Sequence, residues 1–318
     1  MTPLVQVEGL RVEFGAVQAV AGVDLDIHEG ETLGLVGESG CGKSTLGRAL
    51  LRAVEPSAGR IHYLGRDITA LNEGRMRSLR GDMQMVFQDP FGSLNPRRRV
   101  ADIVAEPLLR ARGANRAEAA ARVAELLDRV GLGAEAGRRR PHEFSGGQRQ
   151  RIGIARALAP SPRFVVADEP VSALDVSIQA QVVNLLRELT RDSGLTLLFI
   201  SHDLGVVRHI ADRVAVMYLG QIIEVAARDD FFASPAHPYG EALLSSVPSL
   251  HRTRERIVLT GELPDPANPP SGCRFRTRCR YAVDRCRDEE PQLRAITGGR
   301  TVRCHLPLPT VPRELART

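Results

Sequence analysis

A glycine-rich loop between a short apolar strand and a helix constrains this chain more than any other feature. The loop runs Gly37-Glu-Ser-Gly-Cys-Gly-Lys-Ser-Thr45, after the apolar residues 33–36 and before a helical segment from about Lys43 to Leu51. This spacing matches G-x-x-x-x-G-K-S, a phosphate-binding pattern in its required strand–loop–helix setting. Glycine allows the backbone conformations that turn the loop's N–H groups inward, and the helix dipole adds positive potential.

The same loop contains the only lysine among the 43 cationic residues of the chain, Lys43. Every other cation is arginine, so a compact ammonium serves a purpose here that a planar guanidinium cannot. We expect Lys43 to reach the β- and γ-phosphates of a nucleotide and the Ser44 hydroxyl to bind Mg²⁺. The alternative is a glycine-rich turn without a ligand. The residues expected around the phosphates are Gly37, Glu38, Ser39, Gly40, Cys41, Gly42, Lys43, Ser44 and Thr45.

Two adjacent acids end a second apolar strand, which runs from Phe164 to Asp168. Side chains alternate along a strand, but the chain turns at its end, so Asp168 and Glu169 can face one site. Asp168 is suited to hold Mg²⁺, directly or through water, and Glu169 to polarise an attacking water as a general base. The alternative is the start of a solvated loop.

Three further segments carry weaker signals. A strand over 196–200 is followed by Ser201-His202, and as the neighbour of the acidic strand in a parallel sheet it would place His202 near the γ-phosphate. A lone histidine after a strand is more often structural. Gln88, which follows the apolar residues 83–87, could sense the metal and the water. The segment Ser145-Gly146-Gly147-Gln148 opens a helix with the spacing of a capping box, about 100 residues after the phosphate loop.

In this order, the motifs resemble those of the ABC ATPases. Phe144-Ser-Gly-Gly-Gln148 is similar to the Leu-Ser-Gly-Gly-Gln signature of that family, and a Ser172-Ala-Leu-Asp175 segment follows the acidic strand. The resemblance implies that Phe14 stacks on adenine and that Asp175 lies at the nucleotide. It also implies a head-to-tail dimer with ATP between Lys43 of one chain and Ser145 of the other, and a surface after Gln88 that couples to membrane subunits.

A narrower resemblance is to the oligopeptide/dipeptide importer group, which includes nickel importers. It rests on Val86–Pro96, Asp168–Ser177 and His237-Pro-Tyr239. It implies an ATPase that powers transport, with a second, related ATPase subunit, two membrane permease subunits and an extracytoplasmic binding protein. The alternatives are an ABC protein of translation or DNA repair and a non-catalytic subunit. The first group usually carries two cassettes or a long coiled coil, and the second a degenerate site.

Composition limits the remaining function classes. The net charge is +6 over residues 251–318 and −1 over 1–250, so the main body lacks the basic balance expected of a nucleic-acid binder. No apolar run approaches the roughly 18 residues of a membrane-spanning helix, and the N-terminus does not read as a secretion signal. We therefore expect a peripheral protein at the cytoplasmic face of the inner membrane, without nucleic acid as a partner.

The expected architecture is α/β: a P-loop NTPase fold of the ABC nucleotide-binding type, with a mostly parallel sheet and an antiparallel β segment. An ATPase domain over 1–250 would contain an inserted helical subdomain at about 89–160, including an amphipathic helix from Asn115 to Val130. A small extension over 251–318 would follow, with a proline-rich stretch at 263–270. An arginine run at 138–140 reads as solvated surface.

That extension contains four of the five cysteines. Five, six and seventeen residues lie between successive cysteines, which differs from the paired C-x-x-C spacing of common zinc sites, and the cytoplasm disfavours disulfides. Four thiolates suit either Zn²⁺ or a [4Fe–4S] cluster, and free thiols are the third reading. The importer resemblance favours the cluster. The four residues are Cys273, Cys279, Cys286 and Cys304.

Overall fold

The computed structural model describes residues 3–247 and 257–310 of the 318-residue chain. The chain forms two compact units. The first contains residues 70–200 together with two short N-terminal pieces, and the second contains 5–27, 33–69 and the chain from 201 onward.

The first unit is built on three parallel strands. They are β6 (Met83–Val86), β7 (Phe164–Asp168) and β8 (Thr196–Ile200), in the order β8-β7-β6. Every residue of β7 and β8 is buried, which explains why these segments read as continuous apolar runs. The carboxyl ends of parallel strands lie at one edge, so the residues after β6 and β7 emerge there.

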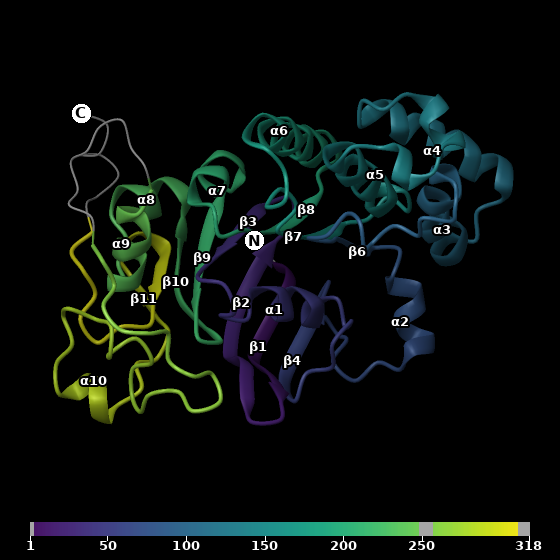
Figure 1. Ribbon diagram of the computed structural model, residues 1–318. Coiled ribbons are helices and arrows are strands. Elements are labelled where there is room, and N and C mark those ends of the chain that lie inside the picture. The colour runs from purple at the N-terminus through teal and green to yellow at the C-terminus, as the bar shows by residue number, and fades with distance from the viewer. Residues whose placement is uncertain (1–2, 248–256, 311–318) are drawn as a thin grey trace. The chain divides into compact units, whose positions relative to one another are not determined.

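Helices are the main other elements of this unit, and α3, α4 and α5 pack against one another (Figure 1). The helix expected from Asn115 is confirmed: the Asn115 side chain accepts from the Glu118 N–H, and the Glu118 carboxylate accepts from the Asn115 N–H. The helical elements are α2 (Glu73–Leu79), α3 (Val100–Arg112), α4 (Arg116–Arg129), η1 (Ala134–Arg138), η2 (Pro141–Glu143), α5 (Gly146–Leu158) and α6 (Val176–Ser193).

The second unit contains two sheets. One places β3 (Thr32–Val36) parallel to β9 (Arg213–Tyr218), and β9 pairs antiparallel with β10 (Gln221–Ala227). The other is antiparallel, in the order β2-β1-β4-β5. Its strands are β1 (Pro3–Phe14), β2 (Val17–His28), β4 (Ala58–Tyr63) and β5 (Arg66–Asp67). This is the mixture of parallel and antiparallel strands that the sequence predicts.

The C-terminal part of the chain extends the first of these sheets. β12 (Arg300–Val302) pairs with β10, and β11 (Arg294–Ile296) pairs with β12. The helices of this unit are α1 (Lys43–Leu50), α7 (Leu204–Ile210), α8 (Arg228–Ala233), α9 (Pro238–Ser245), α10 (Arg285–Asp288) and η3 (Thr297–Gly299). The domain boundary predicted at residue 250 lies outside the described residues and stays a prediction.

None of the helices in the described part of the chain combines the length and the apolar character of a membrane-spanning segment.

Candidate functional site

The phosphate loop joins β3 to α1 in the second unit, and two of its glycines are required by the surrounding backbone. A Cβ atom on Gly37 would lie 2.2 Å from the Met217 carbonyl oxygen, and one on Gly42 would lie 2.0 Å from the Ala19 carbonyl oxygen. Both residues also have positive φ, of 155° and 105°. The loop is therefore enclosed by β9 and β2, and its path depends on glycine at these positions.

Lys43, the first residue of α1, lies inside the curve of this loop. Its side chain is 4% exposed, and its Nζ donates to the carbonyl oxygens of Gly37 at 2.8 Å and Glu38 at 2.9 Å. An ammonium held in this way is poised to exchange a carbonyl for a phosphate oxygen, which is a stronger acceptor because it is charged. Burial raises the pKa of the neighbouring Cys41 thiol, which keeps this side chain neutral and unreactive.

The acidic strand end lies in the first unit. Asp168 is fully buried at the end of β7, and the next residue, Glu169, has a φ of +44°. This left-handed conformation is uncommon outside glycine, and strain of this kind gathers at functional sites. It turns the chain at once, as the sequence predicts, and the Glu169 N–H donates to the Ile200 carbonyl at 3.0 Å.

The structure brings Gln88 and Glu169 together although 81 positions separate them. The Gln88 side-chain amide donates to Glu169 Oε2 at 3.1 Å. The Gln88 amide thus orients the Glu169 carboxylate. The buried Asp168 directly precedes Glu169 in the chain. A carboxylate accepts the proton of an attacking water, and buried carboxylate oxygens are ligands that Mg²⁺ prefers. The side-chain oxygens of Asp168 and Gln88 are therefore of the kind that fits the predicted Mg²⁺.

Ser145 is the N-cap of α5, as expected. Its Oγ accepts from the Gln148 N–H at 3.3 Å, and its own N–H donates to Gln148 Oε1 at 3.0 Å. A Cβ atom on Gly147 would lie 2.4 Å from Ile178 Cγ2, so glycine is needed where α5 packs on α6. Gly146 and Gly147 form the first turn of a 13-residue helix, a position that favours anions.

The other predicted residues occupy different structural roles. Asp175 caps α6, where its carboxylate accepts from the Ile178 N–H at 2.9 Å, and this bond lowers its pKa. Phe14, at the end of β1, is 54% exposed, so its ring face is open for stacking. His202 is the second residue after β8 and is exposed. Phe14, His202 and the phosphate loop belong to one unit, and Gln88, Ser145, Asp168, Glu169 and Asp175 belong to the other. That they serve one nucleotide stays a prediction.

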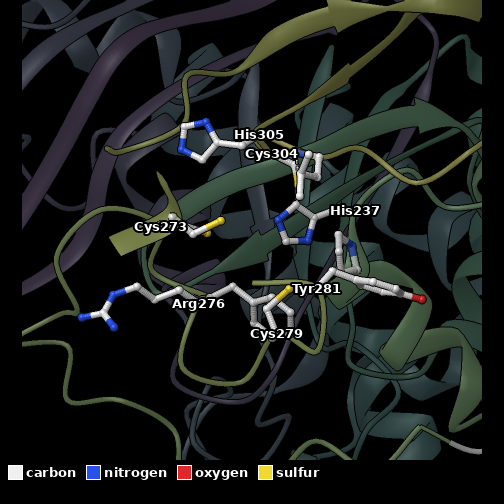
Figure 2. A pocket seen from close by; sticks show the side chains of 11 residues that line it. His237, Cys273, Arg276, Cys279, Tyr281, Cys304 and His305 are labelled. Carbon is white, nitrogen blue, oxygen red and sulfur yellow. Dashed lines mark hydrogen bonds between the residues drawn. The ribbon is translucent and has the colours of Figure 1, made fainter. Parts of the chain in front are cut away.

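The four tail cysteines line one pocket in the second unit, beside His237 and His305 (Figure 2). Its cavity is ≈ 10 Å³, about the space that one water molecule needs. Burial raises the pKa of Cys273 and of Cys304 to about 11, so these thiols are protonated at neutral pH. Within the described ranges, no group of three or more His, Cys, Asp or Glu side chains is arranged to hold a metal ion. The structure therefore does not support a preformed iron–sulfur or zinc site at the cysteines.

Sequence reasoning missed two side chains that contact the phosphate loop. The Tyr239 hydroxyl accepts from the Glu38 N–H at 2.9 Å, and the Arg278 guanidinium donates to the Glu38 carboxylate at 2.8 Å. Tyr239 carried one signal, as part of the His-Pro-Tyr motif. Arg278 carried none, because it is one arginine among 42.

The sequence model described as ABC transporter matches residues 20–172, and the model described as oligopeptide/dipeptide transporter, C-terminal region, matches residues 223–286. A putative oligopeptide transport ATP-binding protein of Bacillus subtilis, YkfD, is 54% identical over 314 residues, which cover 96% of this chain and 95% of the relative. The oligopeptide transport ATP-binding protein AppF of the same organism is 54% identical over 299 residues, covering 92% and 91%. A putative peptide import ATP-binding protein of Brucella ovis is 53% identical over 310 residues, covering 95% and 98%.

Two solved structures share the fold. One is cbiO1 from Clostridium perfringens, part of the ABC transporter complex cbiONQ, with a TM-score of 0.67 and 29% identity over 73% of this chain and 92% of that one. The other is the ATP-binding cassette MJ0796, as a dimer in a post-hydrolysis state bound to ADP and Pi. Its TM-score is 0.64, with 29% identity over 70% of this chain and 98% of that one.

Proposed function

Because the chain belongs to the ATP-binding subunits of ABC transporters, an ATPase family that uses ATP and Mg²⁺, we propose that it powers the import of oligopeptides or dipeptides. The observation that carries the use of ATP is the phosphate loop. In this loop the buried Lys43 ammonium donates to two carbonyl oxygens, which a nucleotide phosphate can replace. The names of the relatives support peptides as the cargo.

Each residue has a proposed role in hydrolysis. The N–H groups of the loop and Lys43 bind the phosphates. Ser44 and Asp168 would hold the Mg²⁺, which would neutralise the charge that develops on the phosphate oxygens. Glu169 accepts the proton of the attacking water, while Gln88 orients its carboxylate through their 3.1 Å hydrogen bond. His202 contacts the γ-phosphate and Phe14 stacks on the adenine.

A partner completes the site. Ser145 and the first turn of α5 form an anion-binding helix start, and we propose that they bind the nucleotide held by the phosphate loop of a second, related ATPase subunit. The dimeric cassette among the solved structures supports this arrangement. Two membrane permease subunits and an extracytoplasmic binding protein would complete the transporter, with this chain on the cytoplasmic face of the membrane.

The cysteine pocket is proposed as a binding site for a [4Fe–4S] cluster, with Zn²⁺ as the alternative. What supports it is the donor set, because four cysteines line one pocket. Binding would require the loops around the pocket to open and the thiols to lose their protons. Anaerobic purification followed by iron, sulfide and zinc analysis tests it, with Cys286→Ser as the comparison. Metal-free protein under these conditions would contradict the proposal.

Reconstitution of the complete transporter in vesicles tests the peptide function. We expect uptake of labelled dipeptide or oligopeptide that requires ATP and stimulates ATP hydrolysis. Stimulation by Ni²⁺ and not by peptides would instead identify a nickel importer. ATP hydrolysis that no membrane partner or cargo changes would indicate an ATPase outside transport.

A further inference from the structure

Glu38, the second residue of the phosphate loop, has all three of its polar groups engaged. Its carbonyl oxygen accepts from Lys43 Nζ at 2.9 Å, and Lys43 is the residue proposed to bind the phosphates. Its N–H donates to the Tyr239 hydroxyl at 2.9 Å, and its carboxylate accepts from Arg278 at 2.8 Å. Glu38 therefore links the lysine that binds phosphate to two residues that follow it by about 200 positions or more.

Arg278 connects the cysteine-bearing segment, residues 273–279, to Glu38 of the phosphate loop. It directly precedes Cys279, and its side chain is only 9% exposed, against 27% for Glu38. A charge-assisted hydrogen bond shielded from water in this way is stronger than one on an open surface. The contact thus holds the long Arg278 side chain in one place beside the phosphate loop.

Aromatic packing fixes the same segment. The Phe275 ring lies 5.2 Å from the Tyr218 ring and 5.4 Å from the Tyr239 ring, both in edge-on geometry. Cys273 and Cys279 flank this cluster and line the cysteine pocket (Figure 2). The residues that support the phosphate loop from outside are therefore packed on the wall of that pocket.

A second connection runs through the turn between β9 and β10. Arg274 donates to the Leu219 carbonyl at 2.6 Å, and the Gly220 N–H donates to the Cys41 carbonyl at 2.9 Å. The segment thus reaches the phosphate loop at both Glu38 and Cys41. A loop supported at two places loses less conformational freedom when a ligand binds.

We propose that Arg278 and Tyr239 are positioning residues that hold the phosphate loop in its binding conformation, so that the cysteine-bearing segment sets the affinity for nucleotide. The inference rests on the proposed function, in which this loop binds ATP. Arg278 acts twice: it restrains the loop, and it pairs the Glu38 carboxylate, which would otherwise repel the phosphates. The effect falls on binding, because the proposed general base, Glu169, is a different residue.

The test measures the dissociation constant of a fluorescent ATP analogue on the full chain, and KM and kcat on the assembled transporter. For Arg278→Gln we expect the dissociation constant and KM to rise about 3- to 10-fold with little change in kcat, the range that corresponds to the net contribution of one typical intramolecular hydrogen bond. Arg278→Lys should lie between this variant and the wild type. Tyr239→Phe should also weaken binding, because the Glu38 N–H loses its acceptor.

Arg280→Gln is the matched control. Arg280 flanks Cys279 on the other side and pairs with Glu241 at 3.0 Å, but its side chain is 52% exposed and makes no described contact with the phosphate loop. The Arg280→Gln variant should bind the ATP analogue with the same dissociation constant as the wild type. Adding Glu38→Gln to Arg278→Gln should recover part of the lost affinity, because the unpaired negative charge is gone.

Wild-type affinity in Arg278→Gln, an equal loss in Arg280→Gln, or additive losses in the double variant would each overturn the inference. A thermal midpoint that falls in Arg278→Gln while the dissociation constant stays unchanged would assign Arg278 a purely structural role and overturn it too. Failure of the proposed function looks different: the wild type would bind no nucleotide, or Lys43→Ala would bind as well as the wild type.

Discussion

At the residue scale, the site predictions depend on short motifs, because each motif combines its residues over a few positions. The phosphate loop spans nine residues and the capping box at Ser145 spans four. Contacts between residues that are far apart in the sequence leave no such short motif. The Arg278–Glu38 pair spans 240 positions, and nothing in the local sequence distinguishes this arginine from its neighbours. The Gln88–Glu169 contact, 81 positions apart, became visible only through the fold.

The single lysine gives the first prediction. Lys43→Arg should lower nucleotide affinity and turnover by at least about 10-fold, because a planar guanidinium cannot adopt the geometry of a compact ammonium between two carbonyls in a buried site. The measurements are the ATP dissociation constant and the rate of hydrolysis. Arg48→Lys, at an exposed position on the same helix, is the control and should change neither. If Lys43→Arg behaves like that control, the reason given for the lone lysine is wrong.

At the element scale, helix starts were predictable because caps and first turns are local. α4 and α5 begin at their predicted caps, and α1 begins at Lys43 as expected. The strand β2 shows where the sequence pattern is too weak: it extends over Val17–His28, but apolar and polar residues alternate strictly only over Val23–Ile27. The first residues of β2 are partly exposed and lack this alternation, so the sequence alone does not indicate where the strand begins.

A buried glutamate on β10, Glu224, gives the second prediction. Glu224 is fully buried and accepts from the N–H groups of Ala236 and His237, both at 2.8 Å, with Arg300 nearby. Burial raises its pKa from 4.5 to about 7, and these hydrogen bonds only partly oppose the shift. The folded protein therefore holds a proton that the unfolded chain releases, and stability falls as the pH rises from about 4.5 to about 7.

Glu224→Gln should remove this dependence, because the amide keeps an acceptor oxygen and carries no charge. Relative to the variant, the wild type should lose up to roughly 3 kcal/mol across that pH range. Thermal midpoints at several pH values measure the difference, with the exposed Glu262→Gln as the control. A wild-type curve parallel to that of Glu224→Gln would show that Glu224 does not titrate in this range.

At the scale of the whole molecule, the motifs follow one another in the order of a known family, and this order predicted the family. The motifs resemble those of the peptide-importer group, but they do not identify an individual cargo. The arrangement of the cysteines was also beyond prediction, since their spacing matches no common metal motif and the pocket forms by tertiary packing.

The third prediction concerns the shared site. Ser145→Arg chains, whose helix start is blocked, are mixed with a wild-type partner ATPase. The nucleotide on the partner's phosphate loop should lose hydrolysis, while ATP still binds to the loop of the mutant chain. If only the site on the mutant's own loop fails, the Ser145 segment acts within its own chain and the shared-site proposal is wrong.

The most direct test of the central claim, that this chain hydrolyses ATP to drive transport, is Glu169→Gln in the reconstituted transporter. ATP hydrolysis should fall by about 10²- to 10⁴-fold, the usual effect of removing a general base, while ATP binding is retained and peptide uptake falls with hydrolysis. Glu188→Gln, an exposed position on α6, is the control and should match the wild type. Hydrolysis at the wild-type rate in Glu169→Gln, or peptide uptake that continues without hydrolysis, would contradict the account.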